Sequence, residues 1–207
     1  MPNEATATRV RLSWLPLGAG DNTHCVRVNG RAFEALQAAY ERRPRRDLYH
    51  SALEVRVADA DHSIEMGPAW GNPPGDRGVV GTGPVGMKFL GRSRFFRYEV
   101  RCWRGGTIPD IAEAVGAPYD LDTDAERAQR LLDLVPQFPR ATWGRDELRT
   151  GDMWNSNTLI SWLLLMSGHD LSRVSLPDRG RAPGWSAGIE VASRSRPAVS
   201  PRGAGGP

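Results

Sequence analysis

The chain of 207 residues is 40% hydrophobic and 25% charged, which is typical of one ordinary globular domain. Its net charge of +3 equals the three arginines of the C-terminal stretch 194–207, which holds no acidic residue, so residues 1–193 are neutral overall. A basic face is therefore not expected, and we predict no nucleic-acid partner.

Three further features restrict the class of protein. The two cysteines are too few for a disulfide framework in a chain of this length. The N-terminus has no apolar run of signal-peptide length. The most apolar segment, 159–166, is far shorter than the ~20 residues that a membrane span needs. We therefore expect a cytoplasmic protein without a membrane span.

Strands dominate the first half of the predicted secondary structure, because apolar and polar residues alternate there. The predicted strands are residues 9–17, 24–28, 48–57, 62–66 and 94–103. The runs 48–57 and 62–66 flank the turn sequence ADAD, which predicts an antiparallel hairpin. One helix, residues 32–43, is expected between the second and third strands.

Helices dominate the second half. The predicted helices are residues 108–115, 122–135 and 155–167. Thr123 and Glu126 are the expected capping box of the middle helix, and Gly168 is the expected end of the last one. A final strand is predicted at 188–192. This order indicates an α+β fold with one domain, residues 1–193, and a tail, 194–207, that is disordered by composition.

The helix at 155–167 is apolar on nearly every side, which is typical of a helix buried in the centre of a domain. It nevertheless opens with Asn155, Ser156 and Asn157. All three residue types cap helices well, so capping alone explains their polarity. A hydroxyl at this place also has a chemical use, because the helix dipole and the unbonded N–H groups of the first turn stabilise a developing oxyanion. Both interpretations stay open.

A serine nucleophile needs a base, and His50 in the strand 48–57 is the candidate. Strand alternation separates His50 from Leu53 and Val55, so His50 need not lie in the core. None of the four histidines lies at a spacing typical of a metal site, and no glycine-rich phosphate loop joins a strand to a helix. We therefore predict neither a metal nor a cofactor.

The order of these motifs resembles the circularly permuted papain-like proteins of the NlpC superfamily, which include the lecithin:retinol acyltransferase group and related peptidases and amidases. In those families a late buried helix opens with Asn-Cys-Asn-Thr or a similar sequence, and the cysteine is the nucleophile. The sequence WNSNTLISWLL (154–164) is similar, with Ser156 at the place of the cysteine. The resemblance covers residues 48–168. It implies a papain-like domain in permuted order, with an antiparallel sheet packed on the 155–167 helix.

The resemblance also implies roles for individual residues. His50 matches the histidine of the family, and the third polar residue falls on the next strand, where His62 and Glu65 compete. Glu65 is favoured as the group that orients His50, because IEM (64–66) lies where the family's second polar residue usually falls. The residues expected to bind substrate are Trp154, Asn155 and Asn157.

Cys25 and His50 in this order would match the unpermuted arrangement, but Cys25 lies in strand-like sequence, so we interpret it as a buried structural thiol. The expected function is hydrolysis or acyl transfer at an amide or ester by Ser156, with a peptide or an acyl-containing small molecule as partner. A serine hydroxyl is a far weaker nucleophile than a thiol. The alternative is therefore a domain that has lost catalysis and binds such a ligand, or a partner protein, without turnover.

Overall fold

The computed structural model describes residues 7–19, 25–70 and 76–195, and only the backbone at residues 25 and 122. One sheet with the strand order β4-β5-β3-β2-β1-β6 organises the fold, and these six strands pair antiparallel. They are β1 (Arg9–Pro16), β2 (Asp47–Val57), β3 (Ala60–Pro68), β4 (Val79–Pro84), β5 (Arg97–Arg104) and β6 (Tyr119–Asp122). The two-residue strand β7 (Gly180–Arg181) pairs parallel with the start of β2.

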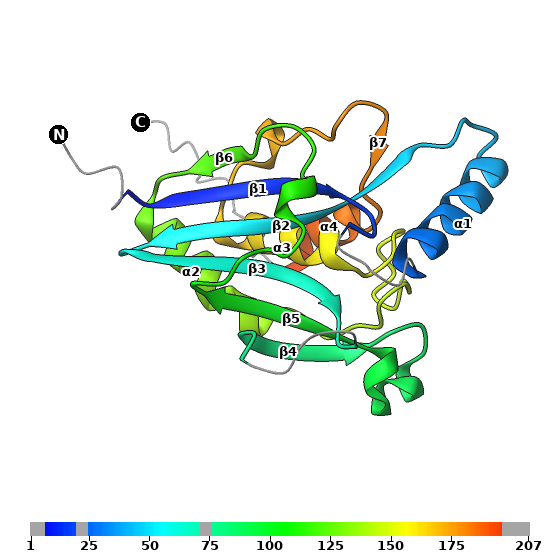
Figure 1. Cartoon of the computed structure of the whole chain (residues 1–207), viewed down its shortest axis with the longest axis horizontal. Coiled ribbons are helices and arrows are strands. Elements are labelled where there is room, and N and C mark those ends of the chain that lie inside the picture. Colours follow the sequence, from blue (N-terminus) through cyan, green and yellow to red (C-terminus); the bar gives the residue numbers. More distant parts are fainter. Residues whose placement is uncertain (1–6, 20–24, 71–75, 196–207) are drawn as a thin grey trace, which may run out of the picture.

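Helices cover one face of this sheet. The helices are α1 (Cys25–Tyr40), α2 (Ala125–Leu134), α3 (Ser156–Ser167) and α4 (Trp185–Ser195). The last three lie behind the sheet in Figure 1, with α3 against β2 and β3, whereas α1 stands at one end of the molecule. The predicted α+β class is confirmed.

The two faces of the sheet differ in what covers them, because successive side chains of a strand point to opposite sides. Leu53 of β2 is fully buried in the main apolar core, which includes Leu159 and Leu163 of α3. Ala52 points the other way and packs against Ile108. We call the helix-covered side the inner face and the other side the outer face, which the segment 105–118 crosses in Figure 1.

Several predicted elements are confirmed. The strands expected at 9–17, 48–57 and 62–66 are β1, β2 and β3, and the hairpin closes at the pair Val57–Ala60. The helix expected at 155–167 is α3, which ends at Gly168 in the left-handed conformation (φ 90°). Here local pattern and tertiary packing agree.

The strand predicted at 188–192 is wrong, because these residues belong to α4. Gly188 allows α4 to cross α3 closely: a Cβ built on Gly188 would lie 2.1 Å from the Ser161 hydroxyl. Close helix packing therefore outweighs the β-branched composition of the segment. The helix also includes Arg194 and Ser195, beyond the expected domain end at 193. The remainder of the predicted tail lies outside the described residues.

Four other predicted features differ in the structure. Residues 25–28 of the strand expected at 24–28 begin α1 instead, and residue 24 is outside the described part. The helix expected at 108–115 is reduced to a 3-10 turn, Ile111–Glu113. Asp124, not Thr123, caps α2 by accepting the Glu126 and Arg127 backbone N–H groups. The strand expected at 94–103 begins at residue 97, since 94–96 form a 3-10 turn.

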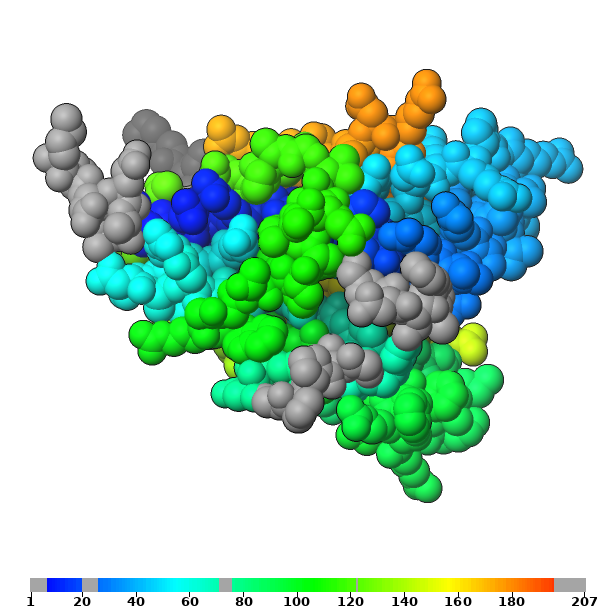
Figure 2. Space-filling model, viewed as in Figure 1, coloured from blue at the N-terminus to red at the C-terminus, as the bar shows by residue number. Residues whose placement is uncertain are grey.

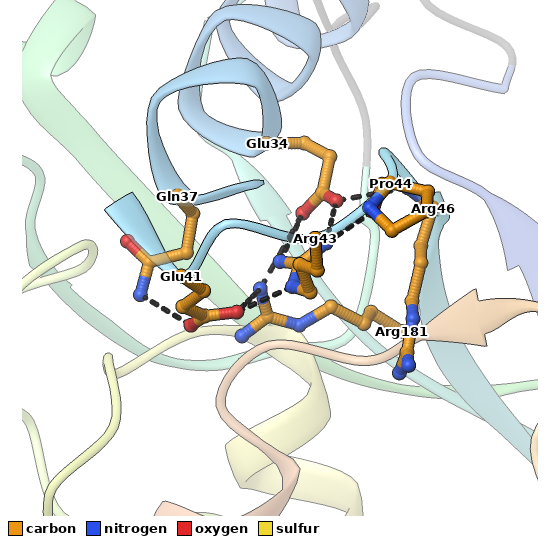
Figure 3. Close-up of polar contacts among 7 residues, drawn as sticks. All are labelled: Glu34, Gln37, Glu41, Arg43, Pro44, Arg46 and Arg181. Atoms are coloured by element: carbon orange, nitrogen blue, oxygen red, sulfur yellow. Dashed lines mark hydrogen bonds and ion pairs between the residues drawn. The ribbon is translucent and has the colours of Figure 1, made fainter. Parts of the chain in front are cut away.

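A buried carboxylate ties α1 to the sheet (Figure 3). Glu34 of α1 is 3% exposed and accepts hydrogen bonds from the Arg43 guanidinium, the Arg46 backbone N–H at 2.8 Å and Arg181 of β7 at 3.4 Å. The hydrogen bonds from Arg43 are the largest cause that lowers the pKa of Glu34. Charge pairing therefore holds the buried side of α1.

Candidate functional site

His50 lies on the outer face of β2 and is paired with a carboxylate. Its Nε2 is 3.1 Å from Asp110 Oδ2, and both side chains are largely shielded from solvent, at 17% and 8% exposure. The other ring nitrogen, Nδ1, has no hydrogen-bond partner among the described residues. A carboxylate on one ring nitrogen fixes the imidazole orientation and leaves the other nitrogen to act as a base.

Asp110 reaches His50 because the segment 105–118 folds over the outer face. Ile108, two residues earlier, is buried against Leu15 and Ala52. Sequence analysis missed Asp110. The apolar residues beside it, Ile108 and Ile111, show that the segment packs on something, but nothing local identifies a strand 60 residues earlier in the chain as the target.

Asn155 caps α3, as one of the two open interpretations requires. Its Oδ1 accepts the backbone N–H groups of Asn157 at 2.9 Å and Thr158 at 3.3 Å, and the Thr158 hydroxyl accepts the Asn155 N–H. The Asn155 side-chain amide donates to the Pro183 carbonyl at 2.7 Å. The polar opening of the helix is thus a complete capping box, and these hydrogen bonds give Asn155 a structural role.

Asn157 attaches the first turn of α3 to the residues of β2 that precede and follow His50 in the sequence. Its amide nitrogen donates to the Tyr49 carbonyl at 2.9 Å, and its amide oxygen accepts from the Ser51 hydroxyl at 2.9 Å. The side chain also donates to the Pro183 carbonyl. Asn157 is 1% exposed, so it positions the helix, and its predicted role as a substrate-binding residue has no exposed group to support it.

The sheet opens next to His50. The ladder between β2 and β3 ends at the pair Leu53–Ile64, whereas residues 65–68 of β3 continue to pair with β5. The first half of β2, which contains His50, therefore pairs with β1 and not with β3. This leaves the β3-side edge of β2 available to another element.

The first turn of α3 occupies that edge. The Leu48 carbonyl accepts the Leu17 N–H on the β1 side, so the next carbonyl, that of Tyr49, points to the opposite edge of the strand. Asn157 binds the Tyr49 carbonyl. Ser51, whose hydroxyl donates to Asn157, has the same strand parity as Leu53, so the start of α3 lies against the inner face of β2, whereas the His50 side chain lies on the outer face.

Ser156, the first residue of α3, is 4% exposed. Its hydroxyl has no hydrogen-bond partner among the described residues, His50 included. The cap uses the N–H groups of Asn157 and Thr158, but no partner in the described parts of the chain accepts the Ser156 N–H. An unbonded hydroxyl and an unbonded N–H thus lie together at the positive end of a helix, which is the place where anions and oxyanions bind.

Glu65, expected to orient His50, lies on the outer face but pairs with a different group. Its carboxylate is 2.6 Å from Arg101 Nη1 of β5. Arg101 is 4% exposed and also donates to Glu99, at 3.1 and 3.0 Å, and Glu99 in turn pairs with Arg77 at 2.9 Å. Glu65 therefore belongs to a shielded charge cluster, and Asp110 holds the position expected for it.

The competing residue, His62, lies on the inner face. It is in register with Val55, a core residue, and is therefore on the opposite side of the sheet from His50. Its Nδ1 is buried and has no hydrogen-bond partner within the described residues. His62 consequently does not orient His50.

Trp154, expected at the binding surface, is a core residue. It is 2% exposed, and its ring stacks on Phe138 with centroids 4.8 Å apart and an interplanar angle of 16°. The indole supports the base of α3 from inside. Trp154 therefore does not form an exposed wall for a ligand.

The two cysteines have different surroundings. Cys25 starts α1, so its assignment to a strand is wrong, and its side chain lies outside the described atoms. Burial raises the pKa of Cys102 to about 11. A thiol with this pKa is almost entirely protonated at neutral pH and is a poor nucleophile.

No family model, no curated protein and no solved structure matches this chain. Within the residues that the structure describes, no cluster of three or more His, Cys, Asp or Glu side chains is arranged to hold a metal ion. The described helices are all too short or too polar to cross a membrane. Interpretation of the site therefore depends on its geometry.

Proposed function

We propose that this chain is a hydrolase or acyltransferase acting on an amide or ester, with its active site where the first turn of α3 meets β2. The observation that carries the proposal is that β2 holds the His50–Asp110 pair and is also bonded, at Tyr49 and Ser51, to the first turn of α3, where Ser156 has an unbonded hydroxyl and an unbonded N–H. The proposal includes the permuted papain-like arrangement, with Asp110 in the orienting role.

In the proposed reaction Ser156 Oγ attacks the carbonyl carbon of the substrate, and His50 Nδ1 accepts the hydroxyl proton. The carbonyl π electrons move to oxygen, and the Ser156 N–H and the α3 dipole stabilise the resulting oxyanion. Collapse of this intermediate breaks the bond to the leaving group, which takes the proton from His50. Water or an acyl acceptor then repeats the sequence on the acyl-serine.

Asp110 has two functions in this scheme. It holds the proton on His50 Nε2, which leaves Nδ1 as the basic nitrogen, and it stabilises the imidazolium that forms during attack. For attack, Ser156 Oγ and His50 Nδ1 must approach each other around the open edge of β2, since the two groups are not hydrogen-bonded in this structure and His50 lies on the outer face. Such contacts commonly tighten only when substrate is bound.

A fluorophosphonate probe tests the proposal. Wild-type protein is expected to be labelled at Ser156, as identified by peptide mass spectrometry, and Ser156→Ala is expected to remove the label. Asp110→Asn should slow labelling about 100-fold or more. The matched control is Ser172→Ala, an exposed serine on another loop, which should label like wild type. Absence of label in wild type, or label elsewhere, contradicts a catalytic Ser156.

One observation favours the second candidate, ligand binding without turnover: the Ser156 hydroxyl is not bonded to His50. The variant Ser156→Cys tests whether the site has the geometry of a nucleophile and a base, which both candidate functions assume. If the geometry is that of a nucleophile and base, the new thiol in a Cys25→Ser background should react with iodoacetamide at least about tenfold faster than Cys102. His50→Ala should remove this advantage. A reactive thiol without serine labelling indicates a binding domain, whereas an unreactive thiol rejects the site itself.

A further inference from the structure

A short segment at one end of the molecule exposes large apolar side chains. Met87–Phe96, which we call the tip, consists of two 3-10 turns, Lys88–Arg92 and Arg94–Phe96, after β4. Phe89 and Phe95 are 68% and 67% exposed, and Phe96 and Met87 are each close to half exposed. Figure 2 shows this green segment projecting at the lower right. Three phenylalanines together on a projecting segment are unusual for a surface that meets only water.

The charge of the tip has one sign. Lys88, Arg92 and Arg94 are exposed between the aromatic residues. No acidic residue occurs in the sequence between Asp76 and Glu99. The tip therefore presents apolar and cationic side chains side by side, so a partner must be both apolar and anionic.

Two acids lie at the base of the tip and need to be counted. Asp146 and Glu147 line a hollow of about 480 Å³ with residues 86–89, and so does Arg145. The hydrogen bond from Thr142 is the largest cause that lowers the pKa of Glu147, with a smaller contribution from the charge of Lys88. Even with both acids included, Lys88, Arg92, Arg94 and Arg145 leave this end of the molecule cationic.

Helix α1 also exposes apolar side chains. Val28, Ala32, Leu36 and Tyr40 recur every four residues and are all exposed, so they form one apolar stripe along the helix. Figure 1 places α1 and the tip at the same end of the long axis of the molecule. Aliphatic side chains such as Val28 and Leu36 suit acyl chains.

We propose that the tip inserts its phenylalanines into the interface of an anionic bilayer, with Lys88, Arg92 and Arg94 at the level of the lipid headgroups. A bilayer of this kind offers acyl chains and negative charge in the same layer, which complements the apolar and cationic side chains of the tip. A symmetric contact with a second copy would bring like charges together. This inference does not depend on the proposed catalytic activity, because none of the tip residues belongs to that site.

Vesicle flotation with the full-length protein tests the proposal. Phosphatidylcholine vesicles in which phosphatidylserine replaces part of the lipid should bind the protein at least about tenfold more strongly than phosphatidylcholine alone, and added salt should weaken binding. Phe89→Ser combined with Phe95→Ser should reduce binding about tenfold or more, since the two rings that would be buried among the lipids are removed. Arg92→Glu should reduce it about tenfold.

Matched controls lie elsewhere on the surface. Leu176→Ser removes an apolar side chain that is 40% exposed on the loop before β7, and Arg130→Glu reverses an exposed charge on α2; neither should change binding. Thermal melting verifies that every variant is folded. The proposal is overturned if anionic lipid gives no advantage, or if the controls weaken binding equally. It is also overturned if the phenylalanines are needed instead for a concentration-dependent dimer or for binding a single-stranded oligonucleotide.

Discussion

The two faces of the sheet are built from the same strands but by different physical means. On the inner face, residues such as Leu53, Ile64 and Val100 are fully buried against α2 and α3. On the outer face, the same strands carry His50 and Arg101, which are paired with carboxylates and are also shielded from water. Alternation along a strand thus separates an apolar side from a charged side within one sheet.

The difference between the faces indicates which one serves the fold. Apolar burial stabilises the folded chain in proportion to area, whereas a shielded ion pair contributes little net stability against an apolar replacement. The outer-face pairs are therefore difficult to explain as stabilising devices. Their position, where β2 and β3 separate and α3 begins, is where the proposed chemistry needs polar groups.

The largest expected effect comes from removing the centre of the outer-face charge cluster. Arg101→Met leaves Glu65 without its partner and Glu99 with Arg77 alone, so we expect the free energy of unfolding to fall by about 4 kcal/mol in urea denaturation. Adding Glu65→Met should restore part of this loss. A cost under about 1 kcal/mol would mean that water solvates the cluster, and the contrast between the faces would not hold.

Two substitutions in one strand compare the faces directly. Leu53→Ala on the inner face should cost about 3 kcal/mol, because it leaves a cavity in the main core. His50→Ala, three residues earlier on the outer face, should cost less, about 1 to 2 kcal/mol, since it leaves the shielded Asp110 carboxylate without its partner but opens little apolar cavity. Urea denaturation measures both. Equal costs would show that both faces contribute equally to stability.

Cys102 reports on burial at the inner face by its reactivity. Its pKa is raised from 9.0 to about 11 by burial, so at pH 8 the folded protein should hold about 100-fold less thiolate than the unfolded chain. Alkylation by iodoacetamide should be slowed by about that factor in a Cys25→Ser background, and the rate should rise with pH up to about 11. A folded-state rate close to that in urea would place the thiol in solvent.

The smallest expected effect is a gain in stability on the outer face. The Ser13 hydroxyl is buried and has no hydrogen-bond partner in the part of the chain that the structure describes, so Ser13→Ala should raise the free energy of unfolding by about 1 kcal/mol. Ser63→Ala is the matched control, because the Ser63 hydroxyl donates to the Gly106 carbonyl at 2.7 Å and its loss should cost about 1 kcal/mol. In thermal or urea unfolding, we expect Ser13→Ala to raise the free energy of unfolding and Ser63→Ala to lower it.

Elements whose stability is decided locally were predictable from the sequence. Helix α3 is an example, because its apolar residues, the cap at Asn155 and the left-handed Gly168 all lie within one segment. The hairpin of β2 and β3 is another, since alternation and a short turn determine its register. Alternation also separated His50 from Leu53. The same local reasoning failed at 188–192, where close packing of Gly188 on α3 decides the conformation.

The partners within the site were decided by the tertiary structure alone. Asp110 reaches His50 only because the segment 105–118 returns over the outer face, and Asn157 places Ser156 beside β2 only because the ladder to β3 ends at Leu53. Glu65 is taken up by Arg101, whose strand pairs with β3. A sequence determines which groups are present and which side of a strand or helix they occupy. Which group lies against which depends on how distant segments return to one another, and the packing of the whole domain decides that.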